Sequence, residues 1–146
     1  MSRVAQSATN VPGLELLPDY IDVDCQERLL AAVDASPWRE DLRRRVQHYG
    51  YQYDYRSRSV GREAYLGPLP GWAAELAERL AEDTPVERAP DQLIVNEYLP
   101  GQGISAHVDC VPCFGDVVLS ISLGSACVMT FAEPATDVSV QVLVDP

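Results

Sequence analysis

The stretch Asp91–Phe131, DQLIVNEYLPGQGISAHVDCVPCFGDVVLSISLGSACVMTF, decides how this chain of 146 residues folds. The segments LIVNEYL, ISAHVDC, DVVLSISLG and ACVMTF within it, and VSVQVLV at 138–144 after it, are short, apolar and rich in β-branched residues, with turn signals between them, which is the pattern of strands. PGQG at 100–103 is a plausible hairpin connection. Within the second of these segments stands HVD, with His107 and Asp109 two residues apart, in a chain that has only two histidines.

Helical patterns precede these strands. Asp24 begins a capping-box-like sequence and is expected to cap the first helix with its side chain. Ser36-Pro37 is expected to end that helix, because proline disfavours helical geometry in its predecessor. GWAAELAERLAEDTP at 71–85 predicts a second helix. Helices followed by a run of strands predict an α+β fold, and we favour a jelly-roll-like core with the N-terminal helices packed on it.

The composition is that of a folded, soluble domain. Hydrophobic residues make up 47% and charged residues 23% of the chain, which excludes an intrinsically disordered protein. No apolar run approaches the roughly 20 residues that span a bilayer, and the first residues lack a secretory signal pattern. We therefore expect a cytoplasmic protein with no membrane partner. Residues 1–12 are expected to be a flexible tail, and residues 13–146 to form one domain.

Four cysteines are too few for the disulfide framework of a small secreted protein, so we expect reduced thiols. Cys25 and Cys127 are interpreted as small core residues. Cys110 and Cys113 form CVPC, and we expect two ordinary thiols there, because no second CxxC or histidine pair completes a zinc set. Half of a zinc site or a redox pair are the alternatives.

The Arg/Tyr segment, RRRVQHYGYQYDYRSR at 43–58, combines basic and aromatic side chains. Its tyrosines alternate, which predicts a strand with one tyrosine-covered face. Arginines can hold phosphates and tyrosines can stack on a flipped or single-stranded base. The candidate substrate-binding residues are therefore Arg43, Arg44, Arg45, Tyr49, Tyr51 and Tyr53.

A basic face in water, beside an aromatic strand packed on the core, explains the same segment. The net charge of −11 also argues against a polyanionic partner at long range, although the segment itself is locally basic. A protein side chain or a small molecule is therefore the alternative substrate to nucleic acid.

HVD has the spacing of a metal-binding pair. Side chains two apart on a strand face the same side, so His107 and Asp109 would lean together and could share one ion. They would supply two members of the 2-His-1-carboxylate triad that holds non-haem Fe(II). For a lone HxD, a histidine hydrogen-bonded to a carboxylate at a strand end is the favoured interpretation, and the neighbouring residues shift the balance towards a metal. Asn96 and Tyr98, also two apart, offer neutral donors that suit a dicarboxylate, or are simply a turn residue and a half-buried sheet residue.

NEYLPGQGISAHVD, followed by FGDVVLSISLGSACVMTF, closely resembles the AlkB-like family of Fe(II)- and 2-oxoglutarate-dependent dioxygenases. RRRVQHYGYQYDY resembles the branch of that family that acts on tRNA wobble uridine. The resemblance implies a double-stranded β-helix (jelly-roll) core, incomplete in this chain. It also implies that His107 and Asp109 are catalytic iron ligands and that Asn96 and Tyr98 contact 2-oxoglutarate.

The implied activity is hydroxylation or oxidative dealkylation of a substrate, with 2-oxoglutarate and dioxygen as co-substrates. A nucleic-acid base, in alkylated DNA or RNA or in tRNA, is the expected target.

The chain departs from the family pattern towards its C-terminal end. The family continues with a second histidine and with arginines that pair with 2-oxoglutarate, whereas here no histidine follows His107 and no arginine follows Arg88. His48 is expected to be structural or on the substrate side. We therefore expect a piece of a larger domain, with weak metal binding and no efficient turnover by residues 1–146 alone. A non-catalytic remnant or interaction module is the alternative.

Overall fold

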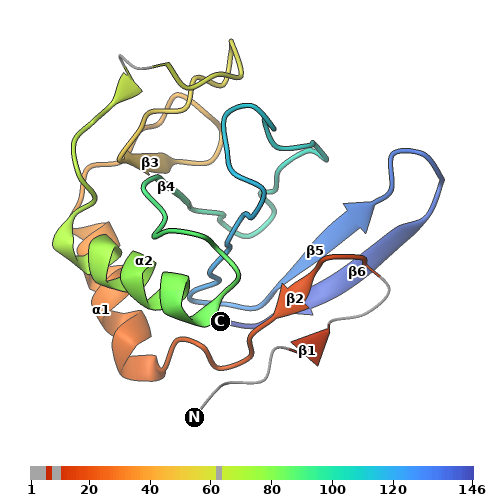
Figure 1. Ribbon diagram of the computed structural model, residues 1–146, viewed down its shortest axis with the longest axis horizontal. Helices are drawn as coiled ribbons and strands as arrows, with labels where there is room; N and C mark the ends of the chain where they lie inside the picture. The colour runs from red at the N-terminus through yellow and green to blue at the C-terminus, as the bar shows by residue number, and fades with distance from the viewer. Residues whose placement is uncertain (1–5, 8–10, 62–63) are drawn as a thin grey trace. The chain divides into compact units, whose positions relative to one another are not determined.

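The computed structural model describes residues 6–7, 11–61 and 64–146, so most of the expected tail lies outside the described residues. Two compact units can be distinguished: the terminal unit, Met1–Ala31 with Ser120–Pro146, and the central unit, Ala32–Leu119. In chain order the elements are β1 (Gln6–Ser7), β2 (Glu15–Leu16), α1 (Val23–Asp34), β3 (Val46–Tyr49), α2 (Gly71–Asp83), β4 (Leu93–Asn96), β5 (Cys127–Ala132) and β6 (Ser139–Val144) (Figure 1).

The strands of the described residues form three antiparallel pairs, β1–β2, β3–β4 and β5–β6. This is the expected α+β content, and the described strands do not close into a barrel. Neither helix in the described part of the chain is long and apolar enough to cross a membrane.

Helix α2 confirms the prediction made from its apolar spacing. Ala73, Ala77 and Leu80 are buried along one face, as the helical period requires. The helix ends where Thr84 turns its backbone N–H and its hydroxyl to the carbonyl of Leu80, at 3.0 and 2.6 Å. The indole of Trp72 meets the ring of Tyr49 edge-on, with 5.4 Å between centroids, and this contact joins α2 to β3.

Helix α1 is also present, but its predicted cap is wrong. The Oδ1 atom of Asp22 accepts the backbone N–H of Cys25 at 2.8 Å, so Asp22 holds the free N–H groups of the first turn. Asp24 lies inside that turn, where its charge favours the positive end of the helix dipole. The helix ends at Asp34, and the Ser36 hydroxyl donates to a carbonyl of the last turn at 2.9 Å.

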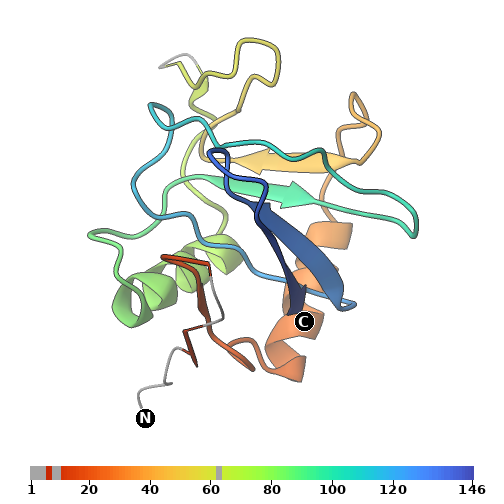
Figure 2. The ribbon, with the colours of Figure 1, turned by 90° about the vertical axis from the view of Figure 1, so that its right-hand side faces the viewer.

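The β3–β4 ladder carries the core of the central unit. Its register pairs Val46 with Asn96, and Val46 is fully buried. Gln47 is buried as well, and its amide is satisfied on both sides. Its Nε2 donates to the carbonyl of Val33 at 2.8 Å, and its Oε1 accepts the hydroxyl of Tyr49 at 2.7 Å. A buried amide would destabilise the fold if it lacked these partners, so Gln47 specifies how β3 meets the end of α1. Figure 2 shows the two strands running in opposite directions.

The strand predicted for the alternating tyrosines is shorter than expected. β3 ends at Tyr49 because Gly50 takes a φ of +76°, and a Cβ there would overlap the carbonyl oxygen of Asp91. Beyond this point only the single bridges Tyr51–Tyr65 and Asp54–Ser59 continue the pairing.

Residues 104–110 and 116–124, which were also predicted as strands, form none. An extended segment becomes a strand only when its N–H and C=O groups find a ladder partner, and residues 98–109 are exposed instead. The last two predicted strands are confirmed as β5 and β6, in register from Cys127–Val144 to Ala132–Ser139.

The terminal unit has its own small core. Tyr20, Leu29 and Val142 are buried, and the side chain of Gln26 accepts the backbone N–H of Gly124 at 2.7 Å. Cys127 is exposed and Cys25 is half-buried, so neither is the core residue that was expected. On β5, Cys127 shares the strand with other exposed side chains.

Gly50→Ala should destabilise the fold more than Gly67→Ala. Both glycines have a positive φ, which costs about 1–3 kcal/mol for a residue with a Cβ. Only at Gly50 would the new methyl group also overlap backbone, which adds about 1–3 kcal/mol, whereas Gly67 faces open space. Urea unfolding of the two variants measures the difference. Equal losses would contradict the close approach of Gly50 to Asp91.

Candidate functional site

His107 and Asp109 lie in a loop, not on a strand, and their side chains nevertheless converge. The loop that we call the HVD loop, residues 104–114, brings Nε2 of His107 to 3.4 Å from Oδ1 of Asp109. About half of each side chain is exposed, at 47% and 53%. The other ring nitrogen of His107, Nδ1, lies 2.8 Å from the carbonyl oxygen of Ser105.

The pair fits a bound divalent metal ion. A proton on Nδ1, donated to Ser105, leaves the lone pair of Nε2 facing the Asp109 carboxylate. Two electron-rich atoms so close are stabilised by a shared cation, which is either a metal ion or a proton on Nε2. Two donors each about 2.1 Å from one ion lie about 3.0 Å apart at a right angle and about 3.4 Å apart at the tetrahedral angle. The observed separation falls in this range.

A third donor does not join them within the described residues, where no group of three metal-binding side chains occurs. His48, the other histidine, packs edge-on against Tyr55 with 5.6 Å between ring centroids. Its Nδ1 is buried with no hydrogen-bond partner among the described residues. Burial, followed by the nearby Arg39 cation, lowers the pKa of His48. These contacts show how His48 packs, and its assignment as a structural or substrate-side residue stays a prediction.

Asn96 and Tyr98 are exposed where β4 ends. The Oδ1 atom of Asn96 accepts Nε–H of Arg44 at 2.8 Å, which leaves the amide N–H groups of Asn96 as the free donors. The Arg44 guanidinium also lies over the ring of Tyr55, 5.7 Å from its centroid. Burial raises the pKa of Tyr55, and its hydroxyl is buried without a hydrogen-bond partner in the described part of the chain.

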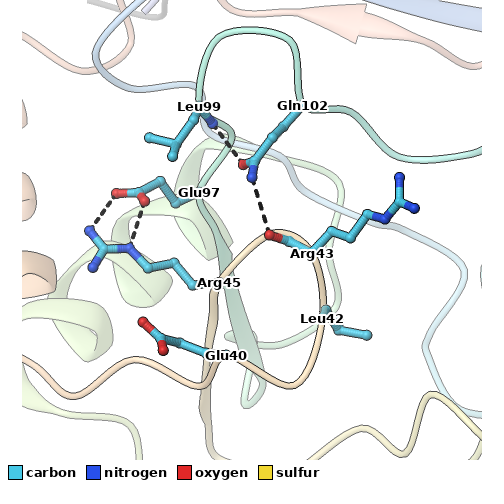
Figure 3. Close-up of a pocket in the computed structure, with 7 residues that line it drawn as sticks. All are labelled: Glu40, Leu42, Arg43, Arg45, Glu97, Leu99 and Gln102. Atoms are coloured by element: carbon cyan, nitrogen blue, oxygen red, sulfur yellow. Dashed lines mark hydrogen bonds and ion pairs between the residues drawn. The ribbon is translucent and has the colours of Figure 1, made fainter.

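A pocket of about 470 Å³ lies beside Glu97, the residue that follows Asn96 (Figure 3). One of its walls is a bidentate ion pair, in which Arg45 donates to both carboxylate oxygens of Glu97 at 2.6 and 2.8 Å. These bonds lower the pKa of Glu97. In Figure 3 the side chain of Arg43 points away from this pair. The complete lining is Glu40, Leu42, Arg43, Arg45, Glu97, Leu99 and Gln102.

The six candidate substrate-binding residues make different contacts. Arg43 and Arg45 line the pocket, whereas Arg44 contacts Asn96. Tyr49 is half-buried and packs edge-on against Trp72 of α2. Tyr51 contacts Tyr65 with 5.2 Å between centroids. The turn at Gly50 ends the strand, so the later tyrosines are not placed by strand alternation. Two of the candidates, Arg44 and Tyr53, both contact the ring of Tyr55.

The Arg/Tyr segment reaches the HVD loop at two points that the sequence did not reveal. Tyr53 stacks on Phe114 with 5.7 Å between centroids and 30° between planes. Nη2 of Arg58 donates to the carbonyl oxygen of Val108 at 2.7 Å. Phe114 follows CVPC directly, and an aromatic residue beside that motif was the available signal. Arg58 had no signal of its own.

Cys110 and Cys113 form a disulfide, so the expectation of two free thiols there is wrong. The two sulfurs lie three residues apart along one tight turn, which brings them together. Cys110 is buried, and its sulfur lies 3.1 Å from the carbonyl oxygen of Arg58.

Comparison with known proteins places this geometry in context. The sequence pattern of the 2OG-Fe(II) oxygenase superfamily matches residues 13–143. An Arabidopsis thaliana protein named "Alkylated DNA repair protein ALKBH8 homolog" is 42% identical over 130 residues, which are 86% of this chain and 38% of that protein. The Mus musculus "tRNA (carboxymethyluridine(34)-5-O)-methyltransferase ALKBH8" is 38% identical over 143 residues, covering 90% of this chain and 21% of that protein.

A more distant relative is the Danio rerio "Probable RNA/DNA demethylase ALKBH6", which is 29% identical over 127 residues. These residues are 84% of this chain and 51% of that protein. The chain therefore spans from about a fifth to about half of the length of these three relatives.

His48→Phe should flatten the response of stability to acid. The pKa of His48 is lowered in the folded chain, so the unfolded chain binds more protons once the pH falls below about 6.5. The free energy of unfolding of the wild type should therefore fall between pH 7.5 and 5.5. In His48→Phe, where phenylalanine keeps the ring contact with Tyr55 but does not titrate, it should fall less. Urea midpoints at the two pH values measure it. A drop of the same size in His48→Phe would refute this assignment.

Proposed function

Because the chain belongs to the 2OG-Fe(II) oxygenase superfamily, we propose that residues 13–146 form an Fe(II)- and 2-oxoglutarate-dependent dioxygenase domain. The proposed reaction is hydroxylation or oxidative dealkylation of a nucleic-acid base, with tRNA as the favoured substrate. The observation that carries this proposal is the convergence of Nε2 of His107 and Oδ1 of Asp109 at 3.4 Å, with Nδ1 of the histidine held by Ser105.

His107 and Asp109 would hold the iron through one nitrogen and one oxygen. When bound, Fe(II) and 2-oxoglutarate supply the oxidative chemistry that protein side chains lack. The task of the protein is to hold these donors still. The contact between His107 and the Ser105 carbonyl fixes both the tautomer and the ring orientation, which makes Nε2 the donor.

Asn96 and Tyr98 would orient 2-oxoglutarate. Arg44 occupies the oxygen of the Asn96 amide, so the N–H groups of that amide are available for a carboxylate. The exposed hydroxyl of Tyr98 is a second neutral donor. The guanidinium of Arg44 stands beside Asn96 and adds a positive charge that favours an acidic ligand.

Nucleic acid is proposed as the substrate because of the Arg/Tyr segment and the relatives. Arg43 points away from the Arg45–Glu97 pair, and its guanidinium is available to a phosphate (Figure 3). Tyr49, Tyr51 and Tyr53 are the proposed stacking residues. Each is half-buried, and each already contacts one aromatic ring, that of Trp72, Tyr65 or Phe114 respectively. The name of the mouse relative refers to tRNA, and that of the zebrafish relative refers to RNA or DNA.

A binding module without catalysis is the second candidate. It is favoured by one observation, that His107 and Asp109 are joined by no third metal-binding side chain in the described ranges. Such a module would bind RNA but no metal ion, so a measurement of metal binding distinguishes the two candidates.

His107→Ala and Asp109→Ala should each weaken Mn(II) binding, measured by the loss of the free Mn(II) signal in electron paramagnetic resonance with 2-oxoglutarate present. Each variant removes one of two donors, and the expected loss is about tenfold or more. Asp116→Asn removes a carboxylate near the same loop and should leave the affinity unchanged. Binding that survives both alanine substitutions would mean that the metal is held elsewhere.

Arg43→Ala should weaken binding of single-stranded RNA and flatten its dependence on salt. Each phosphate contact contributes about −0.7 to the slope of log K against log salt for single strands, so the loss of one contact should reduce the slope by about that amount. Fluorescence anisotropy over a range of salt concentrations measures it. Arg88→Ala removes the same charge at an exposed site and is the matched control. Binding that does not depend on salt would contradict phosphate recognition by Arg43.

A further inference from the structure

Two loops of the central unit are joined around the candidate metal ligands. The first, which we call the Arg58 loop, is residues 50–59, and the second is the HVD loop. Arg58 donates to the carbonyl of Val108, the residue between His107 and Asp109, at 2.7 Å. Tyr53 stacks on Phe114, and the carbonyl oxygen of Arg58 lies 3.1 Å from the sulfur of Cys110. Three contacts between residues far apart in the sequence therefore join the Arg58 loop to the HVD loop.

The backbone of Arg58 is strained. Its φ is +50°, in the left-handed region that residues with a Cβ rarely adopt. Such a conformation is unfavourable and persists only where the surroundings enforce it. The preceding turn is tightly organised, because the carboxylate of Asp54 accepts the backbone N–H of Arg56 at 2.8 Å and the hydroxyl of Ser57 at 2.7 Å. The turn thus delivers the Arg58 side chain to the HVD loop.

The contact with Val108 acts on the ligands because of where it lies. The carbonyl of Val108 belongs to the peptide that leads into Asp109, and a hydrogen bond to it fixes the plane of that peptide. The plane sets the direction of the Asp109 side chain relative to His107. In a β-strand a ladder would do this, but residues 104–110 form no strand. The guanidinium supplies the missing restraint with a charge-assisted bond, which is stronger than a neutral one.

We propose that Arg58 is a positioning residue for the metal site: by binding the Val108 carbonyl it holds His107 and Asp109 in the arrangement that binds a divalent ion. This inference rests on the proposed function, since it takes His107 and Asp109 as the metal ligands. It adds that a residue of the Arg/Tyr segment, roughly fifty positions earlier in the chain, determines the affinity of that site.

The test is Mn(II) binding, with 2-oxoglutarate present, by the full chain carrying Arg58→Ala or Arg58→Gly. Both variants should bind Mn(II) about tenfold more weakly than the wild type, the loss typical of a residue that orients a metal ligand. The glycine variant guards against misfolding, because glycine adopts a positive φ without strain and should keep the turn intact. Arg58→Lys retains a cationic donor and should recover part of the affinity.

The sign of the effect separates positioning from simple electrostatics. A positive charge near a cation site repels the cation, so if Arg58 acted only through its charge, its removal would strengthen Mn(II) binding. Arg56→Ala removes the same charge from the same loop and should not weaken Mn(II) binding. Thiol titration confirms that the Cys110–Cys113 bridge is intact in each variant.

Equal or tighter Mn(II) binding by either Arg58 variant would overturn the inference and leave the proposed function standing. A loss with alanine but not with glycine would also overturn it, because the backbone and not the guanidinium would then be responsible. If the wild-type chain itself bound no Mn(II), the proposed metal site and this inference would both fail.

Discussion

The register of the β3–β4 ladder is the constraint on which the rest of the central unit depends. Pairing Val46 with Asn96 sets Arg45 beside Glu97 and brings Arg44 to the amide of Asn96. Arg44 and Arg45 directly precede β3, and the backbone N–H of Glu97 donates to the carbonyl of Arg45 at 3.1 Å, so the alternation of the strand extends to them and they make different contacts. Arg45 forms a wall of the pocket with Glu97, and Arg44 binds the amide oxygen of Asn96 and leaves its N–H groups free. A shift of one residue would exchange these faces and dismantle both arrangements.

Regular periodicity was what the sequence revealed best. Helix α2 and the β5–β6 pair were predicted correctly because their apolar residues recur at the helical or strand period. The closeness of His107 and Asp109 was also anticipated, although through a local conformation that the loop does not adopt. A spacing of two allows two side chains to converge in a strand and in some loops alike, so the pair could be predicted even though the backbone around it could not.

Contacts between residues about fifty positions apart had no counterpart in the sequence pattern. Arg58 with Val108, Arg44 with Asn96 and Gln102 with the carbonyl of Arg43 join loops whose paths depend on turns such as the one at Gly50. An arginine on such a loop has the same local signature whether it faces water or binds a carbonyl. The choice between Asp22 and Asp24 as helix cap had a similar origin, since both residue types suit the position and only the backbone decides.

The Cys110–Cys113 bridge bears on which ions the neighbouring imidazole and carboxylate can attract. Sulfur binds metals as thiolate, and a bridged sulfur has no thiolate to offer. The donors left in this stretch are then nitrogen and oxygen, which suit iron and manganese. Opening the bridge would place two soft donors directly after Asp109, and softer donor sets favour zinc or monovalent copper. With the bridge closed, His107 and Asp109 are the donors that the HVD loop presents to a metal ion.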